Sequence, residues 1–206
     1  MVEKKHPLRP QVEWHSRGYL PHWEAGEHPQ SITFRLADSL PSELLSRWAR
    51  DLKESDPELD STEQRRRYEE ALDKGHGEAL LAQPDAGSIV QAALLHFDGV
   101  RYRLHAWSIM PNHVHVLATP LVPHALSAII HSWKSFTALQ INRALGRQGM
   151  LWFPEYFDRR IRDEGHFQRA LYYIETNAVS AGLCARAEDW PHSSAACIRG
   201  SNEVEL

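Results

Sequence analysis

The stretch WSIMPNHVHVLATP, residues 107–120, places two histidines in an otherwise apolar run directly after a Pro-Asn turn. The residues on both sides of this turn show a strand pattern, which predicts a β-hairpin over about residues 100–120. In a strand, His113 and His115 project to one face about 7 Å apart, whereas Val114 and Val116 project to the other. We therefore expect a sheet that buries one apolar face and presents an imidazole pair on the other.

The histidine pair has two interpretations. Two imidazoles on one face can bind a single cation, but histidines are also common as hydrogen-bonded residues of a half-exposed strand. A nucleotide hydrolase with a His-x-His-x-His run is excluded, because the third position is Leu117. A metal held for catalysis needs at least one more protein ligand and an open position. The sequence has to supply that ligand from another segment.

The stretch ALYYIETNAV, residues 170–179, offers such a group. Tyr173 and Asn177 are four residues apart and share one helix face, so a His-His-Asn metal site would have the Tyr173 hydroxyl one helical turn from the ion. A phenol is a weak nucleophile at neutral pH, and a cation that polarises a phosphate makes the phosphorus easier to attack. Alternatively, Tyr172 and Tyr173 are core aromatic residues beside Leu171 and Ile174.

The order of elements predicts an α+β fold, with an antiparallel sheet and helices packed on one face. We expect a single domain over residues 1–206, with an irregular N-terminal arm at about 1–30 and a helical insertion at about 40–85. The long amphipathic helix should bury Leu126, Ile129, Ile130, Trp133, Phe136, Leu139 and Ile141. The predicted strands lie at 31–37, 100–110 and 113–120, a short extended element at 150–163, and helices at 39–54, 60–75, 88–97, 124–146 and 164–182.

The composition narrows the class of protein. The chain has 206 residues, 42% of them hydrophobic, and a formal net charge of −4, which argues against a nucleic-acid coat protein. Acidic residues crowd positions 24–85, whereas the later half is richer in Lys and Arg, so a local basic face is compatible with the acidic total. Neither a membrane span nor a secretory signal is indicated, and we expect a cytoplasmic protein. Cys184 and Cys197 are interpreted as ordinary thiols.

Several ordered stretches carry a family resemblance: MPNHVHVLATP, HSWKSFTA, YFDRRIRDEGHFQRALYYIETNAVSAGL and EDWPHSSA. Over about residues 18–196 the chain resembles the single-tyrosine HUH transposases of the IS200-like family, in particular their REP-associated tyrosine transposase branch. The resemblance implies a ferredoxin-like (RRM-like) sheet and a divalent metal, Mg²⁺ or Mn²⁺, bound by His113, His115 and Asn177. It implies Tyr173 as the nucleophile. The family usually has proline after the asparagine, whereas this chain has Ala178, which bears on where the helix ends.

The activity implied by the resemblance is cleavage and rejoining of single-stranded DNA beside a hairpin of the repetitive extragenic palindrome type, through a 5′-phosphotyrosine intermediate. It also implies association with the nucleoid. A monomer is favoured over a homodimer, because no long apolar edge stands out. Two other functions stay open: a domesticated hairpin-binding protein without turnover, and an unrelated metal-dependent hydrolase of small phosphoesters. Candidate DNA contacts are Lys134, Arg143, Arg147, Tyr156, Arg159, Arg160 and Arg162.

Overall fold

Three segments with a strand pattern lie side by side at the centre of the molecule. In the computed structural model, which describes residues 13–16, 21–24, 26–41, 43–44 and 61–197, they pair with a fourth strand in an antiparallel sheet. The predicted strand near residues 31–37 and the hairpin at the Pro-Asn turn are confirmed. The strands, in the sheet order β4-β5-β3-β6, are β4 (Tyr102–Ile109), β5 (His113–Pro120), β3 (Gln30–Arg35) and β6 (Phe157–Arg160).

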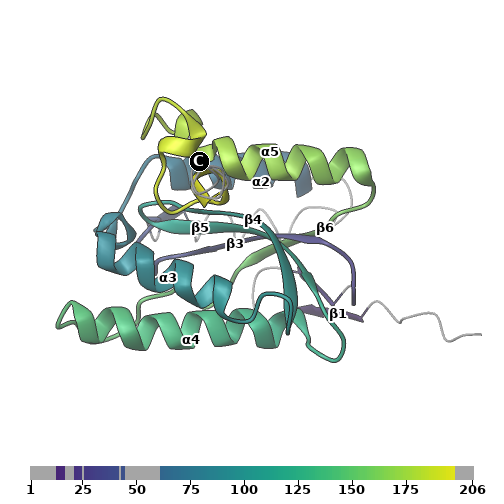
Figure 1. Cartoon of the computed structure of the whole chain (residues 1–206). Coiled ribbons are helices and arrows are strands. Elements are labelled where there is room, and N and C mark those ends of the chain that lie inside the picture. The colour runs from purple at the N-terminus through teal and green to yellow at the C-terminus, as the bar shows by residue number, and fades with distance from the viewer. Residues whose placement is uncertain (1–12, 17–20, 25, 42, 45–60, 198–206) are drawn as a thin grey trace, which may run out of the picture.

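Helices cover both faces of this sheet (Figure 1). The succession β3, α3, β4, β5, α4, β6 is the β-α-β-β-α-β arrangement of ferredoxin-like folds, so the predicted α+β class is confirmed. Within the described residues, no helix is long and apolar enough to cross a bilayer. The described helices are α2 (Ser61–Asp73), α3 (Pro84–His96), α4 (Leu126–Ala144) and α5 (Glu164–Ser180), with short 3-10 helices η1 (Leu80–Ala82) and η2 (Ala187–Asp189).

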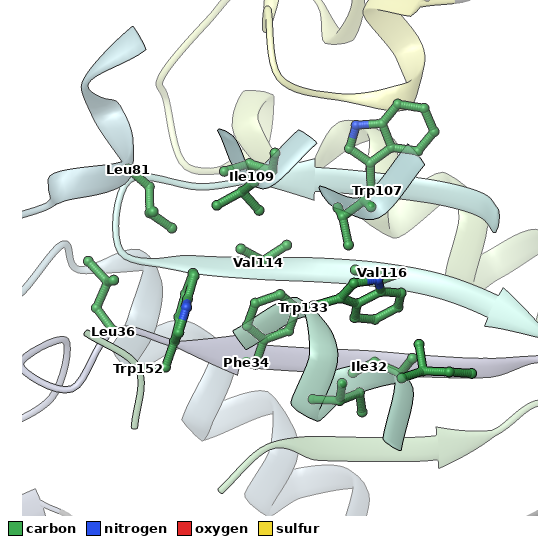
Figure 2. Close-up of a cluster of buried hydrophobic side chains, with 14 of the residues drawn as sticks. Ile32, Phe34, Leu36, Leu81, Trp107, Ile109, Val114, Val116, Trp133 and Trp152 are labelled. Atoms are coloured by element: carbon green, nitrogen blue, oxygen red, sulfur yellow. The ribbon is translucent and has the colours of Figure 1, made fainter. Parts of the chain in front are cut away.

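The larger hydrophobic core lies between the sheet and the pair α3 and α4. Figure 2 shows side chains of β3, β4 and β5 gathered on this face, together with large aromatic residues. The Phe34 and Trp152 rings meet edge to face with centroids 4.9 Å apart, and Trp133 of α4 donates its Nε1–H to the Tyr102 hydroxyl at 2.9 Å. This apolar face therefore supplies most of the buried hydrophobic area that stabilises the fold.

The opposite face of the sheet is covered by α2 and α5 (Figure 1). There Leu117 of β5 and Ala106 of β4 pack with Ile174 of α5 in a second, smaller core. The expectation that the helices pack on one face holds for α3 and α4 but is wrong for these two. The physical reason is that His113, His115 and Leu117 project away from the larger core, and the elements outside the β-α-β-β-α-β arrangement bury them.

The long helix α4 buries a narrower stripe than predicted. Leu126, Ile129, Ile130, Trp133 and Ile141 are buried, but Phe136 is 50% and Leu139 is 65% exposed, so those two assignments are wrong. Because each residue advances about 100°, the position one turn after Trp133 is Thr137, whose hydroxyl donates to the Trp133 carbonyl and accepts from Trp152 Nε1. A polar side chain thus occupies the core face, and the two apolar ones face outward.

Element boundaries differ from the prediction at the start of α3 and in the N-terminal arm. Helix α3 begins at Pro84 rather than near residue 88, since proline suits a first helical turn. The predicted irregular arm contains a two-stranded antiparallel ladder, β1 (Glu13–Ser16) and β2 (Pro21–Glu24), in which Trp14 lies opposite Trp23. In neither segment do apolar and polar residues alternate clearly enough to predict a strand. Most of the helix predicted at 39–54 lies outside the described residues.

The C-terminal segment, residues 190–194, packs along the free edge of β4. Ile109 N donates to the His192 carbonyl at 2.9 Å, and Trp107 N donates to Ser194 Oγ at 3.2 Å. Further along the same strand, Leu104 N donates to the Asp98 carboxylate at 2.8 Å. Backbone amides along this edge are therefore bonded within the chain rather than left open. The segment also contacts α3, because a Cβ on Gly87 would come within 2.5 Å of the His192 ring.

Candidate functional site

The two histidines of β5 converge on one point of the α2-α5 face. Nε2 of His113 lies 2.9 Å from Nε2 of His115, and both side chains are only 1% exposed. Two ligands at right angles around an ion about 2.1 Å away would be about 3 Å apart. In the structure this is the distance of an N–H···N hydrogen bond between the rings, and it is also compatible with one shared cation.

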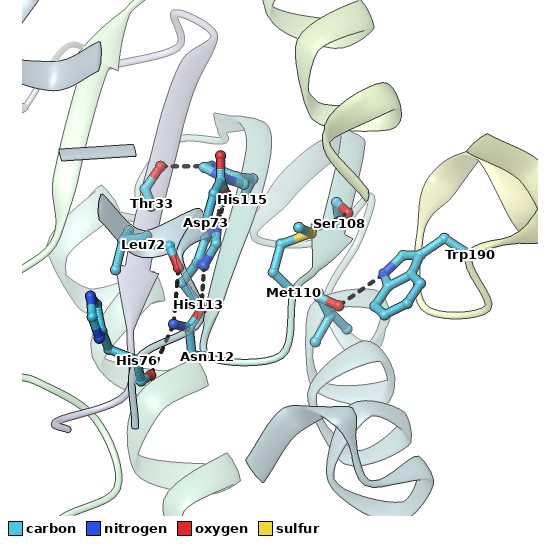
Figure 3. Close-up of polar contacts among 11 residues, drawn as sticks. Thr33, Leu72, Asp73, His76, Ser108, Met110, Asn112, His113, His115 and Trp190 are labelled. Atoms are coloured by element: carbon cyan, nitrogen blue, oxygen red, sulfur yellow. Dashed lines mark hydrogen bonds and ion pairs between the residues drawn. The ribbon is translucent and has the colours of Figure 1, made fainter. Parts of the chain in front are cut away.

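The outer nitrogens of both rings are held by neighbouring side chains (Figure 3). Asn112 donates its amide N–H groups to the carbonyls of Leu72 and His76, so its Oδ1 faces His113 Nδ1 at 2.7 Å. His113 Nδ1 must then carry the proton, which leaves Nε2 unprotonated, with a lone pair available. His115 Nδ1 lies 2.9 Å from the hydroxyl of Thr33, the residue directly opposite on β3. Such outer contacts orient metal-binding histidines.

Burial, reinforced by the neighbouring imidazole of His115, holds the pKa of His113 well below its usual range. His113 is therefore neutral at physiological pH, which is the form that binds a metal. Asp73, the last residue of α2, lies beside the same ring, with its Oδ1 3.8 Å from His113 Nε2. Burial, with Glu69 and Glu70 adding to it, raises the pKa of Asp73 to about 6.

Helix α5 brings Tyr173, but not Tyr172, to the histidines. The Tyr173 ring lies 5.5 Å from the His115 ring, measured between centroids, and the two rings are nearly perpendicular. Tyr172 is 69% exposed, so it is not a core residue. Tyr156, a candidate DNA contact, packs against the larger hydrophobic core. Of these three tyrosines, Tyr173 is the one whose ring contacts the imidazole pair.

Asn177 follows Tyr173 by one helical turn and is 1% exposed. Neither the amide oxygen nor the amide nitrogen of its side chain has a hydrogen-bond partner in the structure. A buried amide without partners costs about 1–3 kcal/mol, so such a group calls for a ligand. The helix continues past Ala178 to Ser180, so the absence of proline at this position leaves Asn177 within the helix.

The donor set fits a divalent cation when amide oxygen is counted among the ligands. Within the described residues, His, Cys, Asp and Glu form no ready-made group of three that could hold a metal. The imidazole pair supplies two nitrogens, and the unpartnered Asn177 amide supplies a donor of the kind expected from the sequence. Which side chains bind an ion stays a prediction.

The basic residues proposed to contact DNA are dispersed. Lys134, Arg143 and Arg147 belong to α4 or follow it, and α4 covers the face of the sheet opposite the histidines (Figure 1). Lys134 donates to the carbonyls of Phe153 and Pro154 at 2.6 and 2.7 Å, and burial lowers its pKa to about 8. Arg147 pairs with Glu78. The structure therefore does not gather these three residues around the candidate site.

The remaining arginines lie on or just after β6. Arg159 pairs in register with Ser31 and therefore shares its face with Thr33 and His115, whereas Arg160 points to the other face, where its guanidinium lies 3.3 Å from His28. Arg162 follows the strand and is exposed. Among the candidate DNA contacts in β6, Arg159 is the one that the register places on the histidine face.

The sequence reasoning missed three polar side chains of the site: Thr33, Asn112 and Asp73. Asn112 could have been found, because it directly precedes the histidines in the Pro-Asn turn. Thr33 needed the register of β3 against β5, which alternation does not give. Asp73 carried no signal at all, because it lies 40 residues before His113 and reaches it through packing of the insertion helix.

Part of the chain is similar to known proteins. Residues 88–177, which include β4, β5 and most of α5, match the family model described as Transposase IS200 like. This part of the chain is therefore similar to the IS200-like transposases.

The chain is also similar to the REP-associated tyrosine transposase of Escherichia coli (strain K12), with 26% identity over 93 residues. The match covers 45% of this chain and 54% of the relative, so it spans about half of the relative's length. The solved structure of a REP-associated tyrosine transposase bound to a REP hairpin aligns with a TM-score of 0.50 and 18% identity, over 89% of this chain and 82% of that chain. The two proteins share their fold.

Proposed function

We propose that this protein is a transposase-like enzyme that cleaves and rejoins single-stranded DNA beside a hairpin, with Tyr173 as its nucleophile. The observation that carries the proposal is the meeting of three side chains from two distant segments, β5 and α5. The Nε2 atoms of His113 and His115 lie 2.9 Å apart. The centroid of the Tyr173 ring lies 5.5 Å from that of the His115 ring. The family match over residues 88–177 supports the same reaction class.

In this proposal, His113, His115 and Asn177 hold a divalent cation, Mg²⁺ or Mn²⁺. When bound, the cation would neutralise charge on the scissile phosphate and make the phosphorus more electrophilic. Imidazole ligands favour Mn²⁺ over Mg²⁺, so Mn²⁺ is the better cation for experiments. Asn112 and Thr33 orient the two rings and fix which nitrogens remain available.

The covalent step follows from the position of Tyr173. Its phenol oxygen forms a bond to phosphorus while the bond between phosphorus and the 3′ oxygen breaks. The phenol loses its proton to solvent, and the departing 3′ oxygen takes one up to become a free 3′-hydroxyl. The downstream DNA is left attached to Tyr173 through its 5′ phosphate. Attack by another 3′-hydroxyl on this linkage would rejoin a strand without an external energy source.

The test is trapping of the covalent adduct. Hairpin oligonucleotides with single-stranded flanks, taken from palindromes beside the protein's own gene and labelled at the 3′ end, are incubated with the protein and Mn²⁺ and separated by denaturing electrophoresis. We expect label on the wild-type protein and none on Tyr173→Phe. Tyr172→Phe is the matched control, because its exposed ring lies one position away on the same helix, and it should retain the adduct. An adduct on Tyr173→Phe would contradict the proposal.

A second function, hairpin binding without turnover, is favoured by one observation. Both imidazoles are 1% exposed beneath α2 and α5, so a phosphate reaches them only if part of this cover moves. A protein of this kind would shift the labelled hairpin in a native gel with the same affinity in wild type and Tyr173→Phe. It would yield neither an adduct nor a cleaved strand from any hairpin that it binds.

A further inference from the structure

The insertion helix α2 delivers a carboxylate to the histidine pair. Asp73 ends this helix, and Figure 3 shows it beside His113 and His115 of β5. Its Oδ1 is buried, lacks a hydrogen-bond partner, and lies 3.8 Å from His113 Nε2. That distance is too long for a hydrogen bond between the carboxylate and the imidazole. A buried carboxylate oxygen therefore points at the imidazoles without being satisfied by them.

Its surroundings disfavour a negative charge. Asp73 occupies the C-terminal end of a helix, where the helix dipole is negative, and two glutamates, Glu69 and Glu70, precede it within one turn. Partial burial adds a desolvation cost for a carboxylate. A cation beside Oδ1 would reverse the sign of these local interactions. The position of Asp73 is thus unfavourable without a cation and favourable with one.

Two of the three separations between these donors are short enough for a shared ion. Two ligands on opposite sides of an ion about 2.1 Å from each can be at most about 4.2 Å apart. The separations of 2.9 Å between the two Nε2 atoms and 3.8 Å between His113 Nε2 and Asp73 Oδ1 both lie below this limit. Within the described residues no closed group of three His, Cys, Asp or Glu ligands is formed, so the partly exposed Asp73 side chain has to turn toward the imidazoles for all three to bind one ion.

We infer that Asp73 is a carboxylate ligand of the divalent cation bound by His113 and His115. The inference rests on the metal site of the proposed function and adds to it. Two imidazoles and an amide are neutral, whereas Mg²⁺ and Mn²⁺ prefer carboxylate oxygen. The carboxylate gives the site its one negative ligand, and it comes from the acidic insertion rather than from the sheet or from α5. Metal binding would then also link the C-terminal end of α2 to β5 through the shared ion.

Calorimetric titration of the full chain with MnCl₂ tests this inference without measuring activity. We expect Asp73→Asn to weaken Mn²⁺ binding by at least about tenfold. The control is Glu164→Gln, an exposed acid in the first turn of α5 that accepts a hydrogen bond from Gln168, and its Mn²⁺ affinity should be unchanged. Wild-type affinity in Asp73→Asn would overturn the inference.

His115→Ala separates this failure from a failure of the proposed function. If His115→Ala loses Mn²⁺ binding while Asp73→Asn keeps it, the metal site stands and Asp73 is not a ligand. If neither variant affects Mn²⁺ binding, the proposed metal site fails, and the inference fails with it.

A second variant covers the case in which Asp73→Asn folds poorly. Asp73→Cys replaces the hard oxygen ligand with a thiol, which prefers Cd²⁺ to Mn²⁺. If Asp73 touches the ion, the ratio of Cd²⁺ to Mn²⁺ affinity should rise at least about tenfold over that of wild type, which already contains Cys184 and Cys197. A residue that only supports α2 would leave this ratio unchanged, and that result would overturn the inference.

Discussion

Along β5, alternate residues face two different interiors: Val114 and Val116 meet α3 and α4, whereas His113 and His115 meet α2 and α5. Both pairs are at most 1% exposed, so the difference is one of chemistry and not of depth. The valine side is filled by interlocking aromatic and aliphatic groups. The histidine side holds imidazoles whose outer nitrogens are bonded to neighbouring side chains.

We expect stability to depend mainly on the apolar face and ligand binding on the histidine face. Burying apolar area is favourable by itself, whereas a buried polar group contributes only when it is bonded. The apolar face can therefore carry the fold, while the histidine face keeps donors such as the Asn177 amide unpartnered for a ligand. We expect substitutions on the two faces to affect different measurements.

The largest expected effect is on the apolar face. Trp133→Ala removes a buried ring that contacts Phe34 and Tyr102 and leaves a cavity, so the free energy of unfolding should fall by about 3–5 kcal/mol. Urea denaturation in the presence of EDTA measures it. Phe136→Ala on the same helix is the control, because that ring is 50% exposed and should matter far less. Equal losses of free energy in the two variants would show that burial against the apolar face of the sheet is not what makes Trp133 important.

The next effect belongs to the histidine face. Mn²⁺ at about 100 times its Kd should raise the free energy of unfolding of the wild type by about 2.7 kcal/mol. His115→Ala should lose this increase, because it removes one of the two converging nitrogens. His105→Ala, on the neighbouring strand and bonded to Thr119 instead, should keep it. Thermal or urea unfolding with and without Mn²⁺ measures the difference, and a full Mn²⁺ response in His115→Ala would contradict the site.

A smaller effect concerns pH in the metal-free protein. Because burial lowers the pKa of His113 from 6.5, the unfolded chain takes up a proton near pH 6.5 that the native chain does not. The free energy of unfolding should therefore be unaffected by His113 above about pH 6.5. Below this pH, His113 should lower the free energy of unfolding by up to about 1.4 kcal/mol for each pH unit.

Asp73 acts with the opposite sign. Its pKa is raised from 3.8 to about 6, so between these values the native chain holds a proton that the unfolded chain lacks, and stability rises as the pH falls. Urea midpoints from pH 7.5 to 5 should therefore fall less steeply in His113→Gln than in wild type, and more steeply in Asp73→Asn. Parallel profiles in all three proteins would show that neither group titrates as described.

The smallest effect tests a hydrogen bond that ties the histidine face to the edge of the sheet. Ser194 Oγ donates to the Glu175 carboxylate of α5 at 2.9 Å and accepts from Trp107 N. Ser194→Ala should lower the free energy of unfolding by about 0.5–1.5 kcal/mol. Exposed Ser135 on α4 offers a control, since Ser135→Ala breaks only a surface contact with His131. A loss as large as that of Trp133→Ala would indicate that the edge, and not the core, dominates stability.

Local periodicity was sufficient for much of the fold. The strands around residues 31–37 and 113–120 repeat every two residues, and the helix over 164–182 ends within two residues of its predicted limit. The same periodicity puts His113 and His115 on one face and Tyr173 one turn before Asn177. Local patterns failed where packing decides, as at Phe136 and Leu139, because a helix that is apolar on more than one side does not reveal which side faces the core.

The meeting of Tyr173 with His115, and of Asp73 with His113, could not be predicted by spacing. Each contact joins segments that are far apart in the chain, and it depends on which face of the sheet α5 and α2 cover. For Tyr173, the family resemblance substituted for this missing information. For Asp73 there was no substitute, since it lies in the insertion, outside the stretches that carry the resemblance.

The C-terminal segment bonded to β4 has a further consequence for how copies of the chain behave in solution. An open strand edge acts as a template on which another molecule can add its own strand, leading to oligomers or aggregates. Here the Trp107 and Ile109 amides are already engaged by residues 190–194 of the same molecule. A chain shortened before Trp190 would expose both groups, and we expect it to self-associate more readily than the full chain.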